Sequence, residues 1–124
     1  MNNISFNFDQ RLDTEFLNSI YEDDFEHASI VFEQFLKVAP VQMKEIEGCF
    51  AAGDIEPFRS RVHKLKPVFS FVGLTAITTK AEALEKKCKE IFSLGEVAAM
   101  YEDFKNDYSI FLPVIESELA KMKK

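Results

Sequence analysis

The chain has 124 residues, of which 47% are hydrophobic, so it can form one compact domain with a substantial apolar core but not two. Its formal net charge of −6 at pH 7 argues against a nucleic-acid-binding protein, because phosphate contacts require a clustered basic surface. No apolar run approaches the roughly 20 residues of a membrane-spanning helix, and residues 1–5 lack the features of a secretory signal. We therefore expect a cytoplasmic protein that binds neither nucleic acid nor membrane.

The predicted elements are a short helix around residues 11–21 and four longer segments. Each longer segment has apolar residues at alternating spacings of three and four, the period of an α-helix. The second segment of the chain contains Phe25, Ala28, Phe32, Phe35, Ala39, Met43, Ile46 and Phe50. The third contains Phe58, Val62, Leu65, Phe69 and Val72, and the fourth contains Ile77, Ala81, Leu84, Cys88 and Ile91. The fifth contains Val97, Tyr101, Phe104, Tyr108, Phe111, Ile115 and Leu119.

Turn and capping residues separate these segments. We expect Asp23 to cap the second helix, and Gly53-Asp54 to end it and cap the third. Gly73 and Thr75 are expected to play the same two roles at the next junction. The run from Ser93 to Glu96 resembles a capping box, so the fifth helix should begin near residue 94.

Three prolines, Pro40, Pro67 and Pro113, lie inside predicted helices. The apolar stripe keeps its phase across each of them, which favours a kinked helix over a break. The predicted fold is therefore all-α: an antiparallel four-helix bundle with an additional short N-terminal helix. We expect a single monomeric domain over residues 1–124, with its core at roughly 12–119, which is either a freestanding protein or a domain excised from a longer one.

His63 is the most informative residue, because it lies on the polar side of the third predicted helix. With the core stripe set at zero on a wheel of about 100° per residue, His63 falls at about 140°. Arg59, Lys66, Ser70 and Pro67 share this arc with it. Arg59 and Lys66 lie one turn before and after the imidazole, so we expect a locally positive site on an acidic protein.

The residues around His63 resemble the pattern of histidine-containing phosphotransfer (HPt) domains, which act in multistep phosphorelays. That pattern places His, any residue, Leu, Lys, Gly and a later Gly on one helix of a four-helix bundle. The match here is His63-Lys64-Leu65-Lys66, then Pro67 in place of the first glycine, and Gly73 at the later position. The turn at residues 51–54 and Phe58 also look like the approach to the family's histidine helix. The resemblance covers roughly Leu12 to Leu119.

This resemblance implies that His63 accepts a phosphoryl group from an aspartyl phosphate on one receiver domain and returns it to an aspartate on another. Lys66 would offset the added negative charge, and Arg59 is a second candidate for that role. The implied partners are response-regulator receiver domains and a sensor or hybrid histidine kinase. No cofactor is expected on this chain, because the receiver supplies the magnesium and the aspartate.

For partner docking we single out Pro67, Ser70, Phe71 and Gly73. Pro67 replaces a small residue one turn after the histidine, where a partner approaches closely. With Val68, both Pro67 and Phe71 lie outside the narrowest core stripe. They form either a docking patch near His63 or a surface that packs beneath the first short helix.

Other polar residues have simpler interpretations. His27 is expected on a helix surface near a capping turn. Three glutamates of the fourth segment, Glu82, Glu85 and Glu90, are expected in solvent, although one of them could reach His63 across the bundle. A di-iron or zinc bundle would need several inward histidines, and the chain has two histidines and no Glu-x-x-His pair, so we expect no metal site.

The sequence leaves one functional alternative, a non-catalytic helical-bundle adaptor that binds a signalling partner through a groove. Its support is the chain's thirteen phenylalanines, although aromatic stripes at helical spacing are mostly core. The four glycines form no phosphate-binding loop, so the chain is not expected to phosphorylate itself from ATP. Cys49 and Cys88 lack CxxC spacing and are expected to be free thiols.

Overall fold

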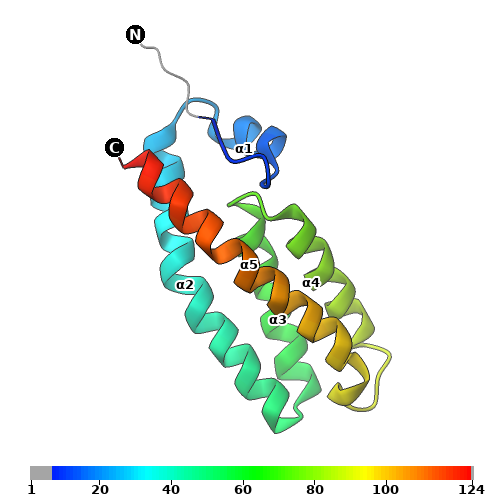
Figure 1. The fold of residues 1–124 in the computed structure, drawn as a ribbon. Helices are drawn as coiled ribbons and strands as arrows, with labels where there is room; N and C mark the ends of the chain where they lie inside the picture. Colours follow the sequence, from blue (N-terminus) through cyan, green and yellow to red (C-terminus); the bar gives the residue numbers. More distant parts are fainter. Residues whose placement is uncertain (1–6, 124) are drawn as a thin grey trace.

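The computed structural model describes residues 7–123, and within them the chain folds into helices without strands. The order is α1 (Thr14–Tyr21), α2 (Phe25–Ala52), α3 (Ile55–Ser70), α4 (Thr75–Lys87), a 3₁₀ helix η1 (Leu94–Val97) and α5 (Ala98–Met122). Helices α2 to α5 form an antiparallel bundle in which α3 contacts α2 and α4, and α5 contacts α2 and α4 (Figure 1). Helix α1 lies at one end, beside the turn between α3 and α4 (Figure 1). The predicted all-α fold is confirmed.

The core follows the predicted apolar stripes. All residues of the third and fourth stripes are buried, including Cys88 and Ile91, which lie beyond the end of α4. The second stripe is less covered at its two ends, where Phe25 and Phe50 are only partly buried, and the fifth is less covered in its middle, at Tyr108 and Phe111. The helices thus bury the faces that their spacing predicts, and the polar face of α3 remains free to carry a site.

Aromatic rings join three of the four long helices at the centre of the core. The ring centroid of Phe69 on α3 lies 5.7 Å from that of Phe35 on α2 and 5.6 Å from that of Phe104 on α5. Both pairs meet edge to face, a favourable geometry for aromatic rings. Phe69 therefore anchors α3, about two turns from His63, to α2 and, across the core, to α5.

The helices run unbroken through all three internal prolines, as the continuous stripes predict. Pro40, Pro67 and Pro113 are each exposed, so the missing amides lie on the solvent side of the bundle. Pro67 cannot donate the helical hydrogen bond that the carbonyl of His63 would otherwise accept.

Several helix boundaries differ from the predictions. Asp24 and not Asp23 caps α2, since its Oδ1 accepts from the amide of His27 at 3.0 Å. At the start of α4 the cap position is Leu74, and the hydroxyl of Thr75 donates to Asp13 at 2.7 Å. Asp54 precedes α3 but makes no capping bond. The predicted capping box near Ser93 is confirmed, but it opens η1, and α5 begins four residues later.

Gly73 shapes the turn between α3 and α4. Its φ of +80° lies in the left-handed region, and a Cβ atom there would lie 2.7 Å from Cδ1 of Leu17 on α1. Its amide donates to Ser70, and its carbonyl accepts from the amide of Asp13 at 2.8 Å. The glycine thus lets α1 pack directly on the turn that joins the two helices of the site.

We expect Gly73→Ala to lower the free energy of unfolding by about 1–3 kcal/mol, because the new methyl group adds left-handed strain and displaces Leu17. Urea denaturation followed by circular dichroism measures this change. Gly48→Ala is the matched control, since Gly48 lies inside α2 with no atom within 4 Å of an added Cβ. That change should leave stability unchanged or raise it by up to about 1 kcal/mol. Equal shifts for the two variants would contradict this role of Gly73.

Two further expectations concern the chain as a whole. Among residues 7–123, no helix combines the length and apolar character that crossing a membrane requires. Cys49 and Cys88 are both free thiols, and burial raises the pKa of Cys88.

Candidate functional site

His63 lies on α3 with 61% of its side chain exposed. Its neighbours Val62 and Leu65 are fully buried, so the helix turns the imidazole away from the core. The Nδ1 atom of His63 lies 2.8 Å from Oε2 of Glu85 on α4. The structure describes no hydrogen bond to Nε2, which leaves this nitrogen available to a reaction partner.

Glu85 is the one of the three glutamates that reaches His63, an alternative that the sequence left open without choosing among them. It was expected in solvent, but only 10% of its side chain is exposed. Burial raises the pKa of Glu85, but a hydrogen bond and charge from Lys66 and the nearby His63 lower it more, so the pKa lies below its ordinary value. Glu85 is therefore ionised at neutral pH and can only accept hydrogen bonds. The exposed Glu82 and Glu90 agree with their predicted positions.

The carboxylate of Glu85 selects one form of the imidazole. Because an ionised carboxylate can only accept, the hydrogen bond at 2.8 Å requires the proton to be on Nδ1 of His63. In the neutral ring, the lone pair then lies on Nε2, the exposed nitrogen. The contact between α3 and α4 thus prepares the outer nitrogen of His63 as a nucleophile.

Both predicted cations lie near His63, but both are paired. The Nζ of Lys66 lies 2.7 Å from Oε1 of Glu85. Arg59 makes three hydrogen bonds of 2.7 to 3.2 Å to Glu56, while its Nη1 lies 3.7 Å from Glu85. Two carboxylates therefore balance the two cations, and the expectation of a positive surround is wrong for the groups closest to the imidazole.

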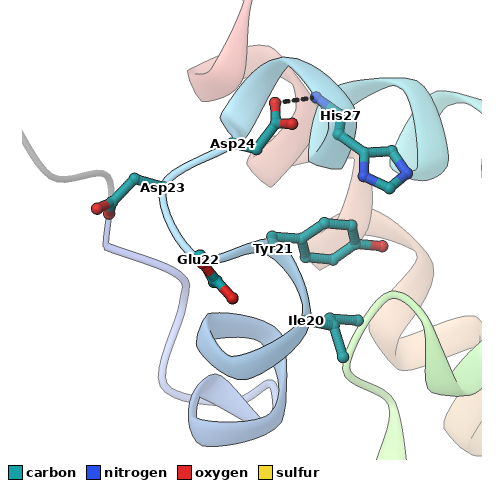
Figure 2. A pocket seen from close by; sticks show the side chains of 6 residues that line it. All are labelled: Ile20, Tyr21, Glu22, Asp23, Asp24 and His27. Carbon is teal, nitrogen blue, oxygen red and sulfur yellow. Dashed lines mark hydrogen bonds between the residues drawn. The ribbon is translucent and has the colours of Figure 1, made fainter.

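His27 occupies a different environment. Its ring packs edge to face on Tyr21, with ring centroids 5.4 Å apart, beside the turn between α1 and α2 (Figure 2). The same open hollow is lined by the carboxylates of Glu22, Asp23 and Asp24 (Figure 2). These would repel a phosphoryl group, so the surroundings of the two histidines favour His63. The prediction that His27 is an exposed helix residue near a capping turn is confirmed.

The four predicted docking residues do not lie on one surface. Pro67 is exposed, Ser70 is partly buried, and Phe71 is 48% exposed. Gly73 is buried beneath α1, so it belongs to the turn and not to a contact surface. Phe71 was expected either in a docking patch or beneath α1, and it contributes to both. Its backbone carbonyl accepts a hydrogen bond from the hydroxyl of Tyr21 on α1 at 2.7 Å, while its side chain stays accessible.

An apolar groove runs between α2 and α3 next to Phe71. Its lining residues are Ile30, Val31, Gln34, Phe35, Val38, Val68 and Phe71. Phe71 lies eight residues after His63, about 12 Å along the helix. The groove and the imidazole are therefore close enough for one globular partner to cover both.

Within residues 7–123, no group of three or more histidine, cysteine, aspartate or glutamate side chains could hold a metal ion. The site consists of one exposed imidazole, one buried carboxylate that accepts from its Nδ1, and one lysine that pairs with the same carboxylate. These groups can take up and release a small anionic group, which is the chemistry of a carrier.

The comparison with protein families also indicates a phosphoryl-group carrier. The family model described as Hpt domain matches residues 31–123, about three quarters of the chain. The chain belongs to the Hpt domain family, whose members transfer phosphoryl groups in two-component signalling together with receiver domains and histidine kinases. Comparisons with curated proteins and with solved structures give no match.

Proposed function

We propose that this protein is a cytoplasmic, monomeric carrier that accepts a phosphoryl group on Nε2 of His63 and passes it on. The donor would be an aspartyl phosphate of one receiver domain, and the acceptor an aspartate of another. A sensor or hybrid histidine kinase would supply the phosphoryl groups that enter the relay. The observation that supports this most is the 2.8 Å contact between Nδ1 of His63 and Glu85, which leaves the exposed Nε2 as the free nucleophile.

In the proposed step, the lone pair of Nε2 forms a bond to phosphorus while the bond from phosphorus to the aspartate oxygen breaks. The electron pair of that bond stays on the leaving carboxylate. Nδ1 keeps its proton, and Glu85 stabilises the positive charge that develops on the ring. The second transfer is the reverse of the first, so no external proton is needed in either direction.

Lys66 is proposed to neutralise the phosphoryl group, because its ammonium group lies one helical turn from His63 and beside Glu85. Arg59 is a weaker candidate, since Glu56 already holds its guanidinium group. Magnesium would be bound by the receiver, where it offsets charge on the transferred group. This chain then needs to supply only the nucleophile and its immediate electrostatic surroundings.

The proposed docking surface comprises Pro67 and Ser70 on α3 and Phe71 directly after it, together with the α2 side of the apolar groove. Pro67 and Phe71 offer apolar contacts, and the exposed Ile30 extends them onto α2. A receiver placed there would cover His63 and exclude water from the reacting atoms.

The test is to incubate the protein with a radiolabelled phosphorylated receiver and magnesium, and to follow the label on both chains. We expect an acid-labile label on this protein, mapped to His63 by mass spectrometry, and its return to a second unphosphorylated receiver. An adaptor would bind the same receivers without taking up label. Binding without label, across receivers that label other carriers, would therefore support the adaptor and contradict the proposal.

A further inference from the structure

We propose that Glu85 is a positioning residue that weakens the hold of His63 on its phosphoryl group by competing with that group for Lys66. This inference rests on the proposed function. It concerns the equilibrium of the phosphoryl group between His63 and the aspartate of a receiver, and names the residue that shifts it. It follows from the position of Glu85 at the centre of the site, where one buried carboxylate lies within 4 Å of His63, Lys66 and Arg59.

At rest, both oxygens of Glu85 are in use. Oε1 accepts from Lys66 at 2.7 Å, and Oε2 accepts from Nδ1 of His63 at 2.8 Å. Arg59 lies farther away, at 3.7 Å, and is held by Glu56. Lys66 is therefore the main counter-ion of Glu85. It is also the cation best placed for a phosphoryl group on His63.

These two tasks of Lys66 conflict once the phosphoryl group arrives. If the ammonium group turns toward the phosphoryl oxygens, the buried carboxylate loses its shortest ion pair, and Arg59 is too far away to replace it at hydrogen-bond distance. If Lys66 stays with Glu85, the phosphoryl group lacks its nearest cation. In either case the competition for Lys66 makes the phosphorylated state less favourable, by more than Glu85 stabilises the charged ring, which favours transfer to the next receiver. We expect Lys66 to turn, because the phosphoryl group carries close to two negative charges and the carboxylate one.

Replacing the carboxylate with a neutral amide should release Lys66. We expect Glu85→Gln to shift the phosphoryl equilibrium with a receiver toward this protein by roughly fivefold, the size of one partly screened charge interaction. The amide oxygen can still accept from Nδ1 of His63. The measurement is the ratio of label on the two proteins after equilibration with a phosphorylated receiver. A ratio that is unchanged, or shifted toward the receiver, would overturn the proposal.

A double-mutant cycle tests whether Lys66 carries the effect. Lys66→Ala alone should shift the equilibrium toward the receiver. In that background Glu85→Gln should change the ratio by less than about twofold, because there is no ammonium group to release. A full shift in both backgrounds would show that Glu85 acts through its charge alone and would refute the competition. Glu82→Gln is the matched control, since Glu82 is an exposed glutamate on the same helix.

A spectroscopic measurement on the unchanged protein avoids any folding defect of the variants. The side-chain carboxyl carbon of Glu85 should change its NMR chemical shift on phosphorylation, as the contact with Lys66 lengthens, and the side-chain nitrogen signal of Lys66 should change with it. Unchanged signals at both residues in a protein labelled at His63 would reject the competition while leaving the proposed function intact. Failure to label His63 at all would instead reject the proposed function.

Discussion

Glutamine at position 63 is expected to abolish phosphoryl uptake while leaving the bundle folded. The amide of His63→Gln has no nucleophilic ring nitrogen, so the acid-labile label should fall by at least about 10³-fold, to background, as for loss of a nucleophile that forms a covalent intermediate. The fold should persist because 61% of the His63 side chain is exposed and its neighbours in the core are unchanged. Transfer of label from a phosphorylated receiver and the thermal unfolding midpoint measure the two effects.

His27→Gln is the control for this experiment. It makes the same chemical change at the other exposed histidine, beside the carboxylates of the turn between α1 and α2. That variant should take up label like the unchanged protein. If the His63 variant keeps an acid-labile label and the His27 variant loses it, the assignment of the acceptor is wrong.

Alanine at position 69 is expected to have the largest effect on stability. Phe69 is fully buried between rings of α2 and α5, so Phe69→Ala removes a large side chain from the centre of the core and leaves a cavity. Such truncations cost about 3–5 kcal/mol, a large part of the total stability of a small domain. Urea denaturation monitored by circular dichroism gives the free energy of unfolding.

Phe71→Ala is the matched control, two residues further along the chain. Phe71 is 48% exposed at the edge of the apolar groove, so loss of its ring should cost less than about 1 kcal/mol of stability. It should instead weaken binding of a receiver, measured by titration calorimetry. Equal losses of stability at the two positions would show that the predicted core stripe of α3 is assigned to the wrong face.

Most of the fold could be predicted because each long helix repeats its apolar residues at the helical period. Phe58, Val62, Leu65 and Phe69 are spaced so that only an α-helix places them on one face, and all four are fully buried. The same spacing placed His63 on the opposite, exposed side. Local chemistry was less decisive at the helix ends, where Asp23 and Asp24 are equally good capping residues and packing selects the second.

The partners of His63 could be predicted only in part. Lys66 lies one turn away on the same helix, so the helical period alone places it near the imidazole. Glu85 lies on another helix, and its contact depends on how far α3 and α4 are shifted along each other. A buried carboxylate in an otherwise polar stretch carries no local signal, although Glu85 follows the buried Leu84 directly and so lies at the edge of the apolar face of α4.

The short turn between α3 and α4 has a consequence for which changes in chain length the protein can accept. His63 and Glu85 lie on consecutive helices joined through Gly73, so this turn determines which residue of α4 faces the imidazole. One inserted residue there would rotate the following helix by about 100° and shift it by about 1.5 Å, which would point Glu85 away from His63. His63 and Glu85 both precede the connection between α4 and η1, so a change in the length of that loop does not alter the register between them. Length variation should therefore be tolerated in that loop and excluded from the turn at Gly73.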